Sequence, residues 1–404
     1  MILMHATLIA VFVAAFAVLI SRRVRANAGW SSMVTPLASI IGSGFLVSVP
    51  LLAGAVGVWA VAAVAGLAAI SYLIGGAIRY NIRYGEPIFA EARPGHVIKS
   101  IETLSHVVLT GAYFVSVAYY LVLLAAFGMR LAGLSNPLVA NWVATAIVAA
   151  ICAVGSTKGL AGVQRAEKFT VSANLAAIAA LLASLAIFGF DLPSGYGWAT
   201  EAGDTPAIDW GTVRFLMGLL IIVQGFETTR FMSQMYDADT RIAAMTRAQI
   251  VSSVVYVIFF VLMIPLFPYF TSNTDVAGVI GVIDRVNPWL PYLVAGAAIA
   301  SQFSASVADS IGASGLITET TQKHINTNHA YLLIGAVAIL VIWATDVVSI
   351  VALASRAFAL FYALQCTVAV LVARHRGEPG RVIAFGALAA LSFAVATLGI
   401  PAGG

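Results

Sequence analysis

Two carboxylates, Glu227 and Asp309, lie well inside long apolar stretches of the sequence. An ionisable side chain in a membrane span costs several kcal/mol unless it is paired or protonated, so it is a functional candidate by default. We expect both groups to take part in ion coupling or gating. Arg356 lies in a later apolar stretch and is a third candidate, for which Glu227 is one partner to consider. The hydroxyls of Ser301 and Ser304 are candidate sodium ligands. Each of these groups also has an ordinary alternative role as a hydrogen-bonding or packing residue.

Two apolar stretches contain helix-weakening residues near their middle. Residues 40–45 read Ile-Ile-Gly-Ser-Gly-Phe, and residues 224–227 read Gln-Gly-Phe-Glu. Glycine lowers helix propensity by about 1 kcal/mol relative to alanine, and backbone groups freed inside a membrane need a polar partner. Both stretches are therefore predicted to be discontinuous helices that bind a polar solute or ion. The alternative for Gly42 and Gly44 is that they only permit close helix packing.

The overall composition sets the class of protein. Charged residues are 9% and hydrophobic residues 61% of the 404, whereas a soluble domain has about 25% charged residues. A water-soluble globule is thereby excluded. The net charge of +4 comes without a basic stripe interleaved with aromatic residues, so no nucleic-acid partner is expected. The six histidines lie at span ends or in loops, and neither a zinc-protease nor a serine-hydrolase motif occurs. This argues against a membrane enzyme, and we expect no cofactor or metal beyond a coupling proton or sodium ion.

The apolar runs predict an all-α polytopic membrane protein with about twelve transmembrane helices. The predicted spans are 4–20, 33–52, 55–78, 103–127, 137–154, 168–190, 212–234, 248–270, 288–314, 330–345, 348–373 and 382–398. Gly42 and Gly225 each fall in the first helix of a five-helix set. Because five is odd, the second set must cross the membrane in the opposite sense, which is the inverted repeat of many secondary transporters. One extra helix precedes this core and one follows it.

This pattern divides the chain into five parts. Residues 1–32 form an extra N-terminal helix with a cytoplasmic loop, 33–190 the first repeat, 191–211 an extracellular acidic loop, 212–373 the second repeat, and 374–404 a final helix and C-terminal part. Most Lys and Arg residues fall in alternate gaps between spans, and basic loops stay in the cytoplasm. We therefore expect a cell membrane location with both termini outside. Arg22 and Arg23 follow the first apolar run instead of preceding it, which favours a retained helix over a signal peptide.

The two glycine motifs also carry a family resemblance. Residues 40–45 resemble the Ile-Ile-Gly-Ser-Gly-Ile-Phe signature on the first core helix of the amino acid, polyamine and organocation (APC) transporter superfamily, and residues 224–227 resemble the Gly-Phe-Glu of its sixth core helix. Gly162-Val163-Gln164 through Lys168 is similar to the Gly-Val-Lys stretch before the fifth core helix. Gly312-Ala313-Ser314 is similar to the end of the eighth, although Gly315 replaces an Arg. The resemblance covers about residues 33 to 373. Two features depart from the usual family pattern. An extra helix precedes the core, and only one helix follows it where the family usually has two.

The resemblance implies a leucine-transporter-like fold and a substrate site at the two breaks. In this family, amides at the first break receive the substrate carboxylate and carbonyls at the sixth core helix receive its ammonium, because half-helix ends favour such charges. Carried over, these residues are Gly42, Ser43 and Gly44 at the anion end, Val223, Gln224 and Gly225 at the cation end, and Phe45 and Phe226 at the side-chain pocket. Ile41 is a further candidate for substrate binding, and Tyr119 is a candidate pocket or gate residue whose alternative role is packing. Sodium-coupled members use hydroxyls of the eighth core helix. Some proton-coupled members place a Lys of the fifth there, where this sequence has Asn174 and Ala177.

Together these features predict a secondary active transporter that moves an amino acid or related organic amine across the lipid bilayer by alternating access. Transport would be coupled to a proton or sodium gradient or proceed by exchange. The alternative from another class is a channel or a non-transporting membrane sensor with the same fold, since the same breaks could bind a ligand without alternating access.

Overall fold

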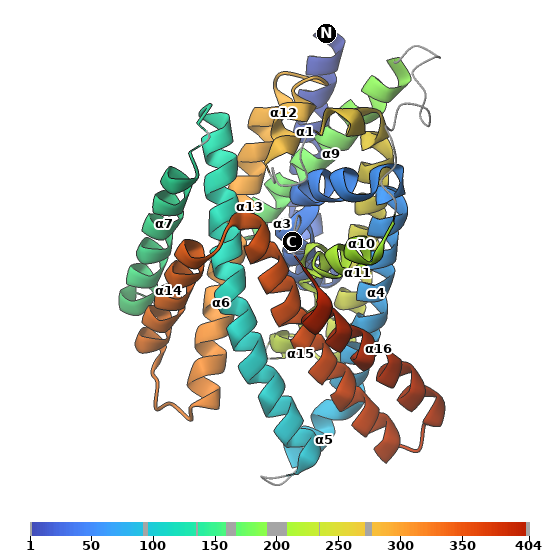
Figure 1. Cartoon of the computed structure of the whole chain (residues 1–404), viewed down its shortest axis with the longest axis vertical. Helices are drawn as coiled ribbons and strands as arrows, with labels where there is room; N and C mark the ends of the chain where they lie inside the picture. Colours follow the sequence, from blue (N-terminus) through green and yellow to red (C-terminus); the bar gives the residue numbers. More distant parts are fainter. Residues whose placement is uncertain are drawn as a thin grey trace.

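The computed structural model describes residues 2–91, 96–134, 136–158, 167–191, 208–233, 235–270 and 277–400, without the side chains of 2–4, 43, 167, 168 and 191. Every regular element among these residues is a helix (Figure 1). The prediction of an all-α membrane protein is thereby confirmed. The Gly162–Gln164 motif and most of the predicted acidic loop 191–211 lie outside the described residues.

Ten helical stretches of the described chain are long and apolar enough to cross a membrane. One of them, Ala28–Glu91, contains two long helices, α3 and α4, which a turn at Gly57 separates. The long helices are α1 (Ile2–Ile20), α3 (Ala28–Val56), α4 (Ala60–Tyr80), α6 (Val97–Leu131), α7 (Pro137–Lys158), α9 (Glu167–Asp191), α11 (Ala238–Met263), α13 (Leu290–Thr320), α14 (Thr327–Ala344), α15 (Val347–His375) and α16 (Pro379–Leu398). Each predicted apolar run overlaps one of these helices or the interrupted segment described below.

Short elements connect the long helices. They are α2 (Arg22–Ala26), η1 (Gly57–Trp59), η2 (Asn81–Gly85), α5 (Glu86–Glu91), η5 (Ile264–Tyr269) and α12 (Gly278–Ile283). Several long helices begin directly after an Asn or Asp whose side chain accepts a hydrogen bond from a first-turn amide: Asn27, Asp237, Asn326 and Asp346. Such caps satisfy amides that have no partner within the helix. They explain why the helices begin at these residues.

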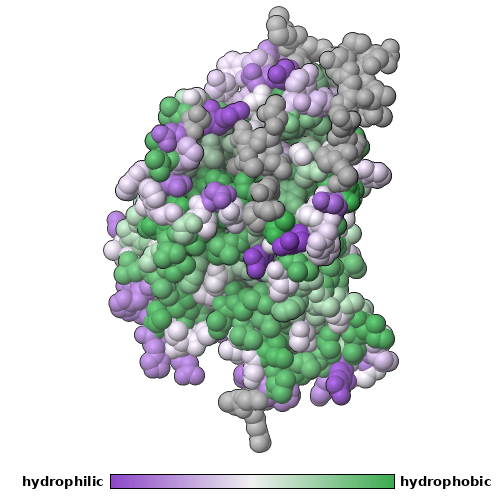
Figure 2. All heavy atoms as spheres, viewed as in Figure 1, coloured by the Kyte–Doolittle hydropathy of each residue, from purple (hydrophilic) through white to green (hydrophobic). Residues whose placement is uncertain are grey.

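The helices form one bundle around α6. This helix packs against α13 and α15, while α3 packs against α11, α7 pairs with α14, α1 lies on α9, and α16 lies on α15. Figure 2 shows hydrophobic residues gathered over the middle of the molecule and hydrophilic ones mostly toward its two ends. This distribution matches a chain whose middle faces lipid tails.

The first predicted break does not exist in this structure. The helix α3 runs without interruption through Gly42, Ser43 and Gly44, so the prediction of a discontinuous first core helix was wrong. A Cβ at Gly44 would lie 2.5 Å from the Ile222 Cα, and a Cβ at Gly42 would lie 2.9 Å from the Ser301 Oγ. These glycines permit close packing against two neighbouring segments, which is the alternative that the motif left open.

The second predicted break is confirmed. The segment consists of α10 (Trp210–Met217), η3 (Leu220–Val223) and η4 (Phe226–Met232), with Gln224 extended and Gly225 left-handed at φ 117°. A side chain at that φ is strained. A Cβ on Gly225 would also lie 2.7 Å from the Ile40 backbone nitrogen and 2.4 Å from the Ser39 Oγ. Only glycine therefore fits where the interrupted segment crosses α3.

Candidate functional site

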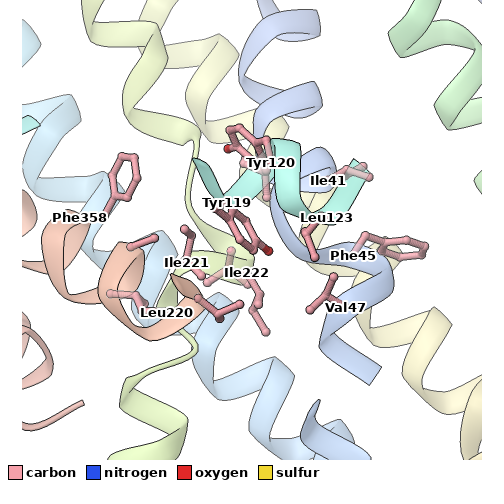
Figure 3. Packing of buried hydrophobic residues seen from close by; sticks show 14 of the residues in the cluster. Ile41, Phe45, Val47, Tyr119, Tyr120, Leu123, Leu220, Ile221, Ile222 and Phe358 are labelled. Atoms are coloured by element: carbon pink, nitrogen blue, oxygen red, sulfur yellow. The ribbon is translucent and has the colours of Figure 1, made fainter. Parts of the chain in front are cut away.

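The candidate site is the interrupted segment around Gly225 and the side chains that hold its freed backbone groups. Figure 3 shows part of its surroundings, with Tyr119 and Tyr120 of α6 between Ile41 of α3 and the η3 residues Ile221 and Ile222. Unpaired amides and carbonyls cannot be left bare at membrane depth. The structure shows which side chains satisfy them.

Three hydroxyl groups from three helices bind the backbone of η3. Ser355 Oγ on α15 accepts a hydrogen bond from the Ile221 amide at 2.9 Å. Tyr256 on α11 donates to the Ile222 carbonyl at 2.5 Å, and Ser71 on α4 donates to the Val223 carbonyl at 3.0 Å. The Val223 carbonyl, which the family resemblance would place at the cation end, is therefore already bound in this conformation.

Glu227 folds back onto the break itself. Its carboxylate accepts hydrogen bonds from the Gly225 amide at 2.9 Å and from the Tyr362 hydroxyl on α15 at 2.8 Å. The ring of Phe226 stacks on the ring of Tyr362, with centroids 5.1 Å apart. Glu227 is only 1% exposed. The carboxylate thus stabilises the left-handed turn, and the same group is the main ionisable side chain at the break.

Two buried glutamines, one at the break and one on α13, each leave an acceptor atom without a donor among the residues that the structure describes. Gln224 Nε2 donates to the Tyr120 hydroxyl at 3.0 Å, and Gln302 Nε2 on α13 donates to the Gly42 carbonyl at 2.8 Å. The Oε1 atoms of both glutamines are buried and have no hydrogen-bond partner in the described part of the chain. Buried acceptors normally have a donor. A ligand with N–H groups or a positive charge would supply one.

A small cavity adjoins Gln302 between α3, α9 and α13. It has a volume of about 20 Å³ and is lined in part by Gly42, Asn174, Ser301 and Gln302. This is enough for about one water molecule. Asn174 Nδ2 of α9 donates to the Ser301 Oγ of α13 at 3.2 Å, so these two side chains of the cavity wall bind each other.

Asp309 belongs to the same buried region. Its carboxyl group accepts a hydrogen bond from the Ser116 hydroxyl on α6, and the residue is 6% exposed. Both intramembrane carboxyl groups are therefore buried and hydrogen-bonded, Glu227 to the break and to α15, and Asp309 to α6.

The other predicted site residues are dispersed. Phe45 stacks on Phe259 of α11 at 4.2 Å and also lines the small cavity with Ile41, Gly42 and Gly44. Ser304 is half-buried on α13, and the side chain of Ser43 lies outside the described part of the chain. Arg356 is exposed and donates to the Ala396 carbonyl at 2.8 Å. The suggested pairing of Arg356 with Glu227 was wrong, because that carboxylate is bound by Gly225 and Tyr362.

A second buried polar cluster lies beyond the break and was missed by sequence reasoning. Arg230 of η4 donates to Glu102 of α6 at 2.5 Å and to Gln365 Oε1 of α15 at 3.0 Å. Gln365 Nε2 in turn donates to the other Glu102 oxygen at 3.0 Å, and His106 contacts Glu102 at 2.9 Å. Arg230 and Glu102 are each 6% exposed. The sequence signal was weak because both residues lie at span ends, where charged residues are expected to face water.

A further arginine extends this cluster. Arg241 of α11 binds the Arg230 carbonyl at 3.0 Å and forms a two-point ion pair with Glu86 of α5 at 2.7 and 2.6 Å. We call Glu102, Arg230, Gln365, Arg241 and Glu86 the η4 lock. The lock ties the second half of the interrupted segment to α5, α6, α11 and α15.

Comparisons with known proteins identify the class to which this fold and site belong. Residues 22–399 match a family described as APC superfamily transporters. The chain belongs to this family. It is also 34% identical over 360 residues to an uncharacterized protein of Aquifex aeolicus (strain VF5), an alignment that covers 88% of this chain and 87% of that protein.

Proposed function

We propose that this protein is a secondary active transporter that moves an amino acid or related organic amine by alternating access, driven by a proton or sodium gradient or by exchange. Family membership supports transport. The observation that carries the proposal is the buried Glu227 carboxylate bound to the Gly225 amide at an interrupted helix. An ionisable group at such a point can link protonation or ion binding to the backbone conformation.

The helix contacts support a two-fold arrangement of the five-helix sets 33–190 and 212–373. Helix α4 packs against α11, α6 against α13, and α7 against α14, while α3 packs against η3 and η4. Each of these pairs joins helices at the same position in the two sets. Crossed contacts also occur in matching pairs, such as α6 with α15 and α9 with α13. An inverted repeat has this pattern, and rocking of one set against the other is its usual transport motion.

The chemistry of the site supports a substrate with an amine. Glu227 and Asp309 supply carboxyl groups, and the Oε1 atoms of Gln224 and Gln302 supply free acceptors. An ammonium group has three donors and no acceptor, so it complements this set. The amides of Gly42 and Gly44 lie inside α3, where helical amides donate to carbonyls four residues earlier. Binding of a substrate carboxylate there would require α3 to open.

The η4 lock supports a closed end of the transport path in this conformation. Opening at that end requires η4 to separate from α6 and α15, and therefore the Arg230–Glu102 ion pair to break. The hydroxyls of Ser71, Tyr256 and Ser355 bind the backbone before Gly225, and the η4 lock binds the segment after it. The two halves of the segment can therefore move at different steps of the cycle.

Counterflow in proteoliposomes tests the proposal directly. Vesicles loaded with an unlabelled amine or amino acid should accumulate the labelled compound transiently, because a carrier exchanges substrate. A channel or sensor gives no such overshoot. The compound is chosen by a thermal-shift screen with and without sodium, since ligands that bind the native state raise the melting temperature.

The variant Glu227→Gln tests the coupling role. Glutamine keeps an acceptor for the Gly225 amide but cannot titrate, so we expect uptake to lose much of its pH dependence while the protein remains folded. Glu319→Gln makes the same chemical change at an exposed position of α13 and serves as the matched control. A Glu227→Gln protein with the wild-type pH profile would remove Glu227 from coupling.

A further inference from the structure

The end of α16 lies against the first half of the interrupted helix. Arg214 of α10 donates through Nε to the Leu398 carbonyl at 2.9 Å, and the Ile400 amide donates to the Arg214 carbonyl at 3.1 Å. Both the side chain and the backbone of Arg214 are thus bound to residues 398–400.

A second arginine holds the same helix end. Arg356 of α15 donates through Nε to the Ala396 carbonyl at 2.8 Å. The last carbonyls of a helix have no partner within the helix, and positive charge is favourable at that end because of the helix dipole. The end of α16 therefore bridges α10 and α15 through two charged donors.

The contact between Gly218 and residues 399–400 is too close for a side chain on either glycine. A Cβ at Gly218, directly after α10, would lie 2.3 Å from the Ile400 carbonyl oxygen. A Cβ at Gly399 would lie 3.2 Å from the Gly218 nitrogen. The backbone of residues 399–400 thus packs directly on the point where α10 ends and the unwound segment begins.

We propose that residues 396–400 form a latch that joins α10 to α15 through the end of α16 and that must release during the transport cycle. The latch acts on the half of the interrupted segment that the η4 lock does not reach. α10 leads into the break, so it cannot move away from α15 without breaking the bonds at Arg214 or the bond at Arg356. The proposal rests on the proposed transport function, because alternating access requires α10 to move. It also gives a role to two arginines that make no bond to Glu227.

Hydrogen exchange of the protein in lipid nanodiscs tests the latch without depending on transport. The double variant Arg214→Met/Arg356→Met removes both charged donors. We expect the α10 amides to exchange about tenfold faster, since loss of a hydrogen bond to a charged group shifts an opening equilibrium by at least roughly that factor. The η4 amides should exchange at the wild-type rate. Arg285→Met is the matched control, because Arg285 is exposed and lies over the Tyr269 ring instead.

A second variant tests the same contact with both arginines present. Gly218→Ala should displace residues 399–400 and speed α10 exchange by a similar factor. Unchanged α10 protection in both variants would overturn the latch, and so would a uniform rise in exchange along all helices, which would assign the arginines to general stability. Counterflow by the wild-type protein decides the transport proposal separately: its absence would refute transport, while the exchange data would still report whether residues 396–400 restrain α10.

Discussion

The buried ion pair of the η4 lock allows a quantitative test. In the variant Glu102→Gln, an amide NH₂ replaces one carboxylate oxygen and faces either the Arg230 guanidinium or the Gln365 amide, both of which are donors. The guanidinium also loses its counter-charge while it remains buried. Removing one partner of a buried pair costs about 3–5 kcal/mol. We therefore expect Glu102→Gln to lower the free energy of unfolding by that amount.

A double-mutant cycle isolates the pair itself. Arg230→Met removes the charge that Glu102 neutralises, so the double variant should lose clearly less stability than the sum of the two single variants. Reversible unfolding in mixed micelles, followed by tryptophan fluorescence, measures each value. The pair Arg83–Asp239 is the control: its distance is also 2.5 Å, but its side chains are 48% and 82% exposed, so its loss should cost about 0–1 kcal/mol. Equal effects at the two pairs, or strict additivity at the lock, would refute the reasoning.

Two further predictions concern packing and capping. Gly44→Ala should lower the melting temperature and cost about 1–3 kcal/mol, because the added methyl meets the Ile222 backbone; Gly66→Ala, with no heavy atom within 4 Å of the added methyl, should not lower it, and equal melting temperatures would contradict this account. At the start of α11, hydrogen bonds from the Thr240 amide and hydroxyl lower the pKa of Asp237. A lowered folded-state pKa stabilises the protein above the unfolded pKa, and this contribution is lost as pH falls through the folded-state pKa. Asp237→Asn should therefore melt below wild type at pH 7, with the difference shrinking toward pH 3; a constant difference would count against the cap.

The interrupted helix could be predicted from sequence because its cause is local. Gln224, Gly225 and Glu227 are consecutive or nearly so, and a glycine with a polar neighbour inside an apolar run is costly unless the backbone leaves the helix. The same reasoning failed at Gly42 and Gly44. A Gly-x-Gly pattern fits both a break and a close helix contact, and the choice depends on Ile222, which lies far along the chain.

The partners of the break could not be predicted for the same reason. Ser71, Tyr256 and Ser355 look like ordinary polar residues in apolar runs, and nothing near them in sequence indicates that they bind η3. Arg230 and Glu102 occupy span ends, where positive charge usually faces the cytoplasm. Their pairing depends on how η4 turns after Gly225, which local sequence does not specify.

The hydroxyls around η3 also bear on how fast the segment can rearrange. A serine or tyrosine hydroxyl can pass its hydrogen bond from a backbone carbonyl to a solute oxygen or a water molecule without ever being left without a partner. Rearrangement at Gly225 can then proceed by swapping partners one at a time, with the total number of hydrogen bonds conserved. A peptide unit surrounded only by aliphatic side chains would have to pass through a desolvated state, at a barrier of several kcal/mol for each orphaned group.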